Sequence, residues 1–516
     1  MSFKNTSRLV KNVGFLYTRM LITMGVSLYT SRVVLDVLGV EDFGIYHVVA
    51  GFVAMLGFLL SALSSSTMRF LSHALGQNDL AKVNSTFLMS INIHGLIALL
   101  ILVVAETVGL QFVANELTIP ADRLDEALFV FHFAVLSFVI TILMVPYNAL
   151  IIAHERMRVY AWVSILDAAL KLAAVLTLSH LAFDALESYG VLMFVVAAIV
   201  ASIYISYCRR QFSEAVFRFH WNPALFRELF SHSGWTMWGS LSGVASSQGV
   251  NILLNIFFGP ALNAARTIAT QVGNALSSFV MNLQQAINPQ LMKSYSAGDL
   301  QYTTSLMFNG SRYNFFLITL LAFPVLLYTD AILEIWLVSV PAYATLFVQL
   351  LLVNIIIDST CKPLMAVSQA TGKIKLYQFT VAGVQLFNLP LVYVAFKSGY
   401  PPESAFWILI ALSFVALWVR MFMLRRIYDY SIKQYITSVL LPCALLGSIS
   451  VLALWLLRQH VLSELYLLLQ LMIMVVLYGF VVIAFGITRA ERQFVVEKTT
   501  RVLDRISFLK KFKIGK

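Results

Sequence analysis

Charged side chains are scarce in this chain. Only 12% of its 516 residues are Asp, Glu, Lys or Arg, whereas 59% are hydrophobic, and the mean hydropathy is +0.82. In soluble domains, about a quarter of the residues are charged. The shortage excludes an ordinary soluble protein and predicts an all-α polytopic membrane protein. The net charge of +11 does not point to nucleic acid, because the basic residues lie in the loops on one side of the predicted membrane helices.

Cysteines and catalytic motifs are lacking too. Cys208, Cys361 and Cys443 are far apart in sequence, so we expect neither a disulfide framework nor a zinc site. The sequence has no nucleotide-binding Walker loop, no GxSxG, no HExxH and no paired-aspartate metal motif. We therefore expect a protein that is not an enzyme and holds no cofactor, which leaves coupling to Na+ or H+ open.

Long apolar runs fill most of the chain. A bilayer core of about 30 Å requires about 20 apolar helical residues. By this measure the sequence predicts about fourteen spans, at residues 13–38, 44–66, 84–110, 126–150, 159–182, 188–208, 234–258, 262–287, 311–336, 342–366, 375–396, 403–424, 436–457 and 464–487. Most of the 36 lysines and arginines then fall on the side of the N-terminus, opposite the acidic loops GVEDFG, ADRLDE and AFDALES. This asymmetry predicts that both termini are cytoplasmic.

The first six predicted spans are repeated in the next six. Matched pairs are Gly14 with Gly234, Gly39 with Gly259, Asp79-Leu80 with Asp299-Leu300 and, at a slightly smaller offset, Pro146 with Pro363, Arg156 with Lys373, Arg158 with Lys375 and Tyr160 with Tyr377. Repeats with an even number of spans have the same orientation and are related by an axis along the membrane normal. We predict lobes at 1–208 and 234–435, a cytoplasmic amphipathic linker at 209–233, two extra spans at 436–487 and a basic cytoplasmic tail at 488–516.

The linker and the tail carry their own signals. Asn222 and Pro223 form a favourable helix start in the linker, and Gly234 predicts its end. The tail is basic and loosely amphipathic, which is typical of a segment that binds anionic membrane lipid.

The start of each predicted lobe has one stretch that lacks acidic residues but keeps polar ones. No Asp or Glu occurs between Met1 and Leu35, and only Asp299 occurs between Phe230 and Leu300. A charge within the membrane usually faces a cavity or a partner. We therefore predict a substrate-binding cavity lined by Arg19, Gln248, Asn251, Asn255, Asn263, Arg266, Gln271 and Asn274. The alternative is that Arg19 and Arg266 extend to the membrane surfaces; for Arg32 we expect a headgroup or loop contact.

Other charges within the spans are interpreted as internal pairs. Asp167 and Lys171 lie four residues apart on one helix face, and Asp358 precedes Lys362 by the same spacing. The alternative function of Asp167 and Asp358 is ion coupling. His47, His94 and His132 show no ligand spacing, so packed polar side chains are expected there.

Two segments resemble the polysaccharide-flippase branch of the multidrug/oligosaccharidyl-lipid/polysaccharide exporter superfamily. They are RVVLDVLGVEDFGIY, after the first span, and ALNAARTIATQVGNALSSFVMNLQQAINPQLMKSYSAGDL, in and after the eighth. The resemblance implies a bacterial inner-membrane flippase of undecaprenyl-diphosphate-linked oligosaccharide, such as an O-antigen unit of lipopolysaccharide. It also implies a cavity between the lobes in which cationic residues of the first and eighth spans, here Arg19 and Arg266, meet the anionic carrier.

The resemblance suggests partners and leaves rivals open. Lipid-linked oligosaccharide and anionic lipid are the expected partners, with a polysaccharide polymerase and other assembly proteins as further candidates. The chief rival is an ion-coupled small-molecule or multidrug exporter of the same superfamily, and a second is a non-transporting scaffold of polysaccharide assembly. The acid-free polar stretches favour an anionic cargo.

Overall fold

The computed structural model of the chain describes residues 3–57, 64, 67–68, 70–71, 74–75, 79–154, 156–215, 221–227, 241–371, 374–460, 466–486 and 492. Within these ranges, the side chains of residues 3–19, 157, 285–286, 289, 293, 374–376, 378 and 460 are not described. The predicted linker end at Gly234 and the tail, apart from Arg492, lie outside the described residues.

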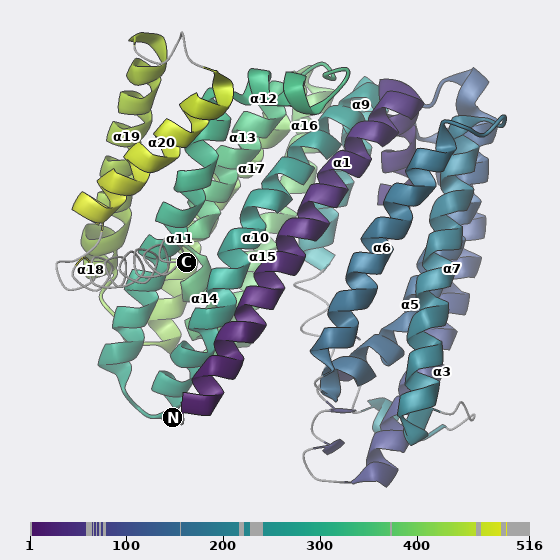
Figure 1. Cartoon of the computed structure of the whole chain (residues 1–516), viewed down its shortest axis with the longest axis horizontal. Helices are drawn as coiled ribbons and strands as arrows, with labels where there is room; N and C mark the ends of the chain where they lie inside the picture. Colours follow the sequence, from purple (N-terminus) through teal and green to yellow (C-terminus); the bar gives the residue numbers. More distant parts are fainter. Residues whose placement is uncertain are drawn as a thin grey trace, which may run out of the picture. The chain divides into compact units, whose positions relative to one another are not determined.

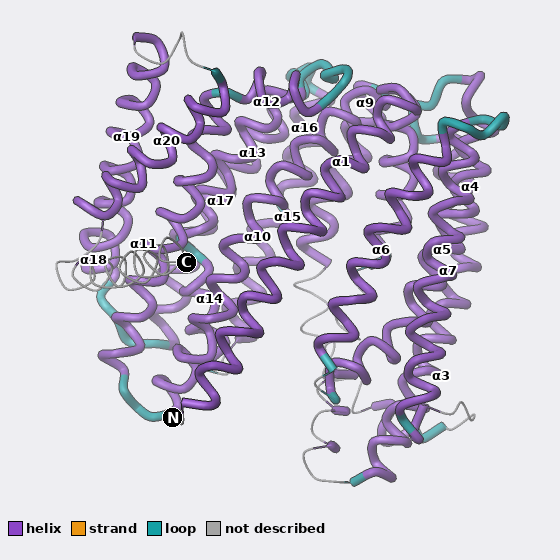
Figure 2. Tube along the Cα trace, in the orientation of Figure 1, coloured by secondary structure: helices purple, strands orange, loops and turns teal. Residues whose placement is uncertain are grey.

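Every regular element in the described ranges is helical (Figures 1 and 2). The α-helices are α1 (Phe3–Met55), α3 (Leu80–Val104), α4 (Leu110–Asn115), α5 (Leu124–Ala153), α6 (Met157–Leu178), α7 (Ala185–Gln211), α9 (Val250–Phe258), α10 (Pro260–Ser296), α11 (Leu300–Leu327), α12 (Thr329–Trp336), α13 (Ala344–Ser359), α14 (Lys362–Ala370), α15 (Ile374–Leu386), α16 (Asn388–Lys397), α17 (Ser404–Ile427), α18 (Ile432–Tyr435), α19 (Leu441–His460) and α20 (Leu467–Val481). Short 3-10 turns are η2 (Ala121–Arg123) and η3 (Ser213–Ala215), and π-helical turns are η1 (Ala105–Gly109), η4 (Ala245–Gly249), η5 (Ile436–Leu440) and η6 (Val482–Gly486).

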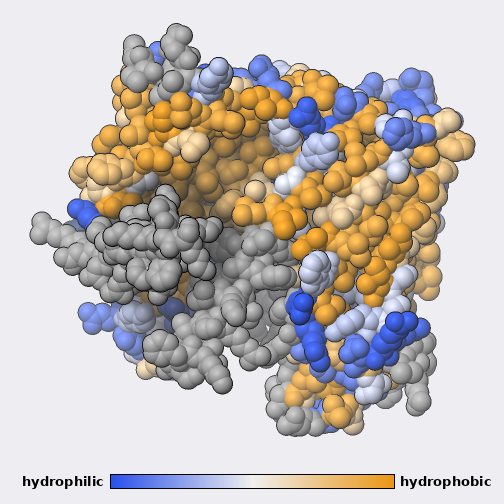
Figure 3. Space-filling model, viewed as in Figure 1, coloured by the Kyte–Doolittle hydropathy of each residue, from blue (hydrophilic) through white to orange (hydrophobic). Residues whose placement is uncertain are grey.

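Eleven helices in the described ranges are long and apolar enough to cross a membrane. They correspond to the third to seventh and the ninth to fourteenth predicted spans, which confirms the polytopic all-α fold. The first two predicted spans fall in α1 and the region after it, and the eighth falls in α10. The total of fourteen stays a prediction. Over α3, α5, α6 and α7, Figure 3 shows a hydrophobic band between hydrophilic ends, as a lipid-facing surface requires.

The matched glycines of the repeat share an unusual backbone conformation. Gly39 has φ 75° and ψ 174°, where the first part of α1 ends, and Gly259 has φ 83° and ψ 177°, between α9 and α10. This region of backbone space is essentially restricted to glycine. The matched aspartates agree as well, because Asp79 and Asp299 cap α3 and α11 by accepting the backbone N–H groups of Lys82 and Tyr302. The sequence repeat is therefore also a repeat of local structure at these positions.

The chain divides into two compact units. The first comprises Met1–Ser278, Ile332–Asn354 and Lys373–Val419, and the second comprises Phe279–Ala331, Ile355–Gly372 and Arg420–Lys516. The lobe boundaries inferred from the repeat stay a prediction. In the linker, the predicted helix start is confirmed, since Asn222 Oδ1 accepts the backbone N–H groups of Ala224 and Leu225 at 3.0 and 3.1 Å.

Three acidic segments of the first unit, all predicted as loops, meet at one arginine. Arg123 binds Asp42 at 2.5 Å, Asp184 at 2.8 Å and Glu126 at 3.5 Å. These residues come from GVEDFG, ADRLDE and AFDALES, so the three loops lie at the same end of the unit. Beyond the other ends of α5 and α7, His154 contacts Glu214 at 2.7 Å. The helices of this unit therefore alternate in direction as the predicted topology requires.

The second unit is held by buried polar contacts between helices. The hydroxyl of Tyr435 donates to Ser311 Oγ at 3.1 Å and to the carbonyl of Thr360 at 3.0 Å. Arg312 donates to the carbonyl of Gly486, at the end of the last predicted span. A cation at a helix C-terminus satisfies carbonyl groups that have no partner within the helix.

Candidate functional site

Arg266 lies on α10, in the eighth predicted span. Its side chain is half-buried, and it has no ion-pair or hydrogen-bond partner in the part of the chain that the structure describes. It lies about 9 Å along the helix from Pro260, since each residue advances the helix by 1.5 Å. Pro260 is pre-organised for the helix start, and Gly259 supplies the sharp turn before it.

Polar groups continue along α10 beyond Arg266. Thr270 and Asn274 follow at four-residue spacing, so they share a helix face with the arginine. The side chain of Asn274 is exposed, and Gln271 Oε1 is buried without a hydrogen-bond partner. A buried amide oxygen without a partner is rare in proteins, and it leaves an acceptor available for a ligand or water. Arg266, Gln271 and Asn274 thus retain free hydrogen-bonding groups.

Three other predicted cavity residues form hydrogen bonds within the protein. Asn255 is fully buried; its Oδ1 accepts the backbone N–H of Thr118 at 2.8 Å, and its Nδ2 donates to the carbonyl of Thr118 at 3.2 Å. Asn263 Nδ2 donates to Asn251, whose own Nδ2 donates to the carbonyl of His47 at 3.3 Å. These amides connect α9 to α1, α10 and the loop before α5, which is a structural function.

Three further residues that the sequence singled out, two arginines and a glutamine, differ in their surroundings. The backbone of Arg19 is part of α1, but its side chain lies outside the described side chains. Arg32 donates to the carbonyl of Ile335, near the end of α12, at 3.3 Å; this is a helix contact, and the expected headgroup or loop contact stays a prediction. Gln248 is half-buried and packs against α1, since a Cβ atom on Gly51 would lie 2.8 Å from its Oε1.

Both predicted ion pairs form. Lys171 Nζ lies 2.9 Å from Asp167 Oδ2, and Lys362 Nζ lies 2.7 Å from Asp358 Oδ2. In addition, the buried Arg420 binds the other oxygen of Asp358 at 2.7 Å, a contact that no local spacing predicts. Asp167 therefore has one cationic partner, and Asp358 has two.

Histidine pairs are further features that the sequence did not reveal. His132 Nδ1 lies 2.7 Å from Glu106 Oε2, and His154 Nε2 lies 2.7 Å from Glu214 Oε1. Each partner is at least 26 positions away, so helical spacing alone could not identify it. By contrast, His94 is a packed polar residue as expected, with Nδ1 2.7 Å from the carbonyl of Ser90.

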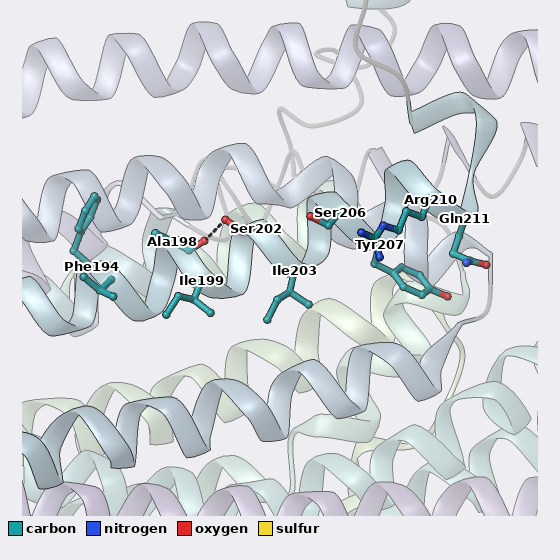
Figure 4. A pocket seen from close by; sticks show the side chains of 10 residues that line it. Phe194, Ala198, Ile199, Ser202, Ile203, Ser206, Tyr207, Arg210 and Gln211 are labelled. Carbon is teal, nitrogen blue, oxygen red and sulfur yellow. Dashed lines mark hydrogen bonds between the residues drawn. The ribbon is translucent and has the colours of Figure 1, made fainter.

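A groove of about 720 Å³ runs along α7. Its described lining comes from one face of that helix, with Phe194, Ile199 and Ile203 along its length and Tyr207, Arg210 and Gln211 near the end (Figure 4). Ser202 in this face donates to the carbonyl of Ala198 at 2.7 Å. None of the predicted site residues lines it. The groove therefore lies apart from the polar face of α10.

Solved structures share the fold at low sequence identity. A lipid II flippase, MurJ, in an inward closed conformation matches with a TM-score of 0.64 and 13% identity, over 91% of this chain and 98% of that chain. The multidrug transporter DinF-BH matches with a TM-score of 0.59 and 14% identity, over 81% and 97%. An inward-facing multidrug resistance MATE family transporter of the MOP superfamily matches with a TM-score of 0.56 and 12% identity, over 79% of this chain and 95% of that chain. A comparison with curated proteins finds no match.

The sequence itself matches a family model described as "Polysaccharide biosynthesis protein" over residues 9–295, which is more than half of the chain. The matched region includes the first segment that carries the resemblance, residues 32–46, and most of the second, residues 261–300. The chain belongs to the polysaccharide biosynthesis protein family.

Proposed function

We propose that the protein is a flippase that moves a diphosphate-linked oligosaccharide lipid across the bacterial inner membrane, with both termini in the cytoplasm. Undecaprenyl diphosphate is the carrier implied by the sequence resemblance, and the oligosaccharide is a repeat unit of O-antigen or another surface polysaccharide. The proposal goes beyond the family assignment and beyond the fold, which the chain shares with a lipid flippase and with a multidrug transporter.

The observation that carries the proposal is the isolated charge of Arg266. A guanidinium in the membrane requires a counter-charge, and in the described residues none is provided by the protein. A diphosphate fits this requirement, because guanidinium groups bind phosphate through two parallel charge-assisted hydrogen bonds. Gln271 and Asn274, on the same helix, offer amides for sugar hydroxyls. Arg19 is the second proposed phosphate contact.

The contacts of Asp167 and Asp358 make these two carboxylates less well supported as the coupling groups of a drug exporter. Such an exporter needs a carboxylate that can exchange its ion or bind a cationic drug. Asp167 is neutralised by Lys171, and Asp358 by Lys362 and Arg420. The flippase hypothesis instead uses the free cation on α10. Translocation would proceed by alternating access, with the prenyl tail remaining in the lipid.

A binding experiment tests the phosphate contact. The purified protein in nanodiscs would be titrated with undecaprenyl diphosphate and with undecaprenyl monophosphate. R266A should weaken diphosphate binding by about 10- to 100-fold, since a hydrogen bond to a charged group contributes about 1.5–3 kcal/mol. The affinity of R266K should lie between those of the wild type and R266A, because lysine keeps the positive charge but cannot form two parallel hydrogen bonds to phosphate. R227A, an exposed arginine of the linker, is the matched control.

A cellular experiment separates the two kinds of transporter. The variants would be expressed in a deletion strain, and surface glycan and drug susceptibility would be measured together. We expect R266A to lose surface glycan, without a change in drug susceptibility. Intact glycan in R266A and R266K, combined with drug hypersensitivity of the deletion strain, would overturn the proposal in favour of a drug exporter.

A further inference from the structure

Two amide side chains of the acid-free region meet at one glycine of α1. A Cβ atom on Gly51 would lie 2.8 Å from Gln248 Oε1 and 3.0 Å from Asn251 Nδ2. These distances are shorter than an ordinary contact of a carbon atom, so a side chain at Gly51 would displace one of the amides. Glycine permits this close approach because it has no Cβ atom. Gln248 and Asn251 therefore lie side by side against α1.

The two amides differ in their hydrogen bonds. Asn251 is buried, its Nδ2 donates to the carbonyl of His47 at 3.3 Å, and its Oδ1 accepts from Asn263 at 2.9 Å. Gln248 is half-buried, and its amide has no hydrogen-bond partner in the part of the chain that the structure describes. Its Oε1 is the amide atom nearest to Gly51, so its Nε2, with two N–H donors, lies farther from α1. Gln248 thus keeps free donors beside a layer of bonded amides.

Arg266 lies close to the same layer, on α10. It follows Asn263 by three positions, and residues at this spacing are neighbours on a helix surface. Asn263 is bonded to Asn251, whose side chain lies beside Gln248. Counted from the turn at Gly259, Gln248 and Arg266 are each about one helical turn beyond the Asn251–Asn263 bond. The contacts therefore bring a free amide of η4 and a free guanidinium of α10 to the same region of the first unit.

The backbone at Gln248 is unusual as well. Residues Ala245–Gly249 form the π-helical turn η4, directly before α9. Such turns are rare and often occur at functional sites. With the offset that aligns the two left-handed glycines, the positions of the first repeat that match Gln248 and Arg266 are Leu28 and Tyr46, and the helix around Leu28 is regular. The repeated scaffold therefore needs neither the amide nor the π-helical turn.

The two free groups complement a diphosphate. A guanidinium binds one phosphate through two parallel hydrogen bonds. Phosphate oxygens accept hydrogen bonds, and an amide nitrogen donates two, so Gln248 suits a phosphate without adding charge. Gln248 and Arg266 are on neighbouring helical segments, whose axes are typically about 8–10 Å apart, so they approach a ligand from different sides. A lipid with two phosphates can occupy both groups, whereas a monophosphate bound by the guanidinium leaves the amide unused.

We propose that Gln248 binds the phosphate next to the one held by Arg266, and that it thereby makes the protein select a lipid diphosphate over a lipid monophosphate. Gly51 is a positioning residue that acts through Gln248. The inference rests on the proposed function, in which Arg266 and Arg19 supply the positive charge for the diphosphate. It deepens that function, because two lipids with the same prenyl chain are then distinguished by a neutral hydrogen-bond donor.

The first experiment measures the preference for diphosphate. The purified protein in nanodiscs would be titrated with undecaprenyl diphosphate and with undecaprenyl monophosphate, which carry no sugar. Q248M keeps the length of the side chain but has no donor, so it should weaken diphosphate binding about tenfold and leave monophosphate binding unchanged. Q111A removes an exposed amide of α4 in the same unit and is the matched control, which should bind both lipids like the wild type. Equal affinity changes for the two lipids in Q248M, or no change for either, would overturn the inference.

A second variant tests the same donor if Q248M does not fold. Q248E keeps the shape of the side chain and replaces the donors with a carboxylate. It should lower the affinity for diphosphate more than the affinity for monophosphate, because like charges then face the second phosphate. A Q248E protein that keeps the preference of the wild type would also overturn the inference.

R266A separates failure of this inference from failure of the proposed function. If R266A weakens the binding of both lipids and Q248M keeps the preference of the wild type, Gln248 is not a phosphate contact and the flippase proposal is unaffected. If R266A binds both lipids like the wild type, the proposed phosphate contact itself is wrong, and the role of Gln248 beside it is refuted too.

The last experiment tests Gly51. In G51A the added methyl group must displace the end of the Gln248 side chain, so the preference for diphosphate should fall while monophosphate binding is kept. In G51A/Q248M the preference should be no lower than in Q248M alone, since two residues that act through one group have non-additive effects. A merely structural defect would weaken the binding of both lipids. That result, or additive losses of preference in the double variant, would refute the positioning role of Gly51.

Discussion

Asn263 on α10 and Asn251 on α9 are joined by a buried double hydrogen bond. Asn263 Nδ2 lies 2.6 Å from the backbone carbonyl oxygen and 2.9 Å from Oδ1 of Asn251. Both side chains are buried, and the sequence alone placed both in a cargo-binding cavity. Their contacts show that the polar residues of this acid-free region differ in how they are bonded. Some hold helices together, and others keep free hydrogen-bonding groups.

This difference gives a prediction for Asn263. N263A should destabilise the protein by about 1–3 kcal/mol, because the acceptors of Asn251 would stay buried without their donor. R266A should leave stability almost unchanged, since Arg266 has no partner in the described residues to lose. Thermal unfolding in detergent distinguishes the two. Equal melting temperatures of N263A and the wild type would argue against a structural function for Asn263.

A side chain at either of the matched glycines should destabilise the protein. G39A and G259A each place a Cβ atom on a backbone with φ near +80°, which costs about 1–3 kcal/mol. G25A is the control, because Gly25 is helical, exposed and has open space around its Cβ position. There alanine should be neutral or stabilising by up to about 1 kcal/mol. Thermal unfolding of the three variants is the measurement, and a loss of stability in G25A comparable to that in G39A would refute the backbone argument.

The loop contacts at Arg123 predict a dependence on acid. Burial raises the pKa of Asp184, but hydrogen bonds from Arg123 and from the backbone N–H of Glu187 outweigh it and lower the pKa below the ordinary value of 3.8. A lowered pKa means that the stabilisation is complete above about pH 4 and is lost as the pH falls further, toward the pKa of the folded state. R123A should be less stable at neutral pH and should lose less on acidification.

The check is a series of unfolding curves between pH 3 and pH 7. R123K is the control for charge, since lysine preserves attraction but cannot contact Asp42 and Asp184 with several parallel hydrogen bonds. Parallel pH profiles for the wild type and R123A would show that this arginine does not set the acid response.

The sequence predicts most of the fold, because the evidence for it is local. Apolar length places the spans, and Gly39 and Gly259 mark the repeat that the backbone then reproduces. Contacts between distant segments are a different matter. Arg123 with Asp184, or Glu106 with His132, depend on how helices are packed, and no spacing in a single sequence encodes them. The same limit explains why the sequence did not distinguish Asn263, which is bonded to Asn251, from Arg266, which has no partner among the described residues.

Asp358 offers the sharpest test of whether an intramembrane carboxylate is structural or couples an ion. Both of its oxygens are bound at 2.7 Å, by Lys362 and by Arg420, and the Arg420 side chain is only 10% exposed. If the cluster is structural, D358N should cost about 3–5 kcal/mol of stability, because it removes the carboxylate that balances the charge of a buried guanidinium. K362Q should cost at most about 1 kcal/mol, since Lys362 is much more exposed. If Asp358 instead binds a coupling ion, D358N should keep the melting temperature of the wild type and lose export. A stable D358N without export would therefore assign this carboxylate to energy coupling, and an unstable one to the packing of α13, α14 and α17.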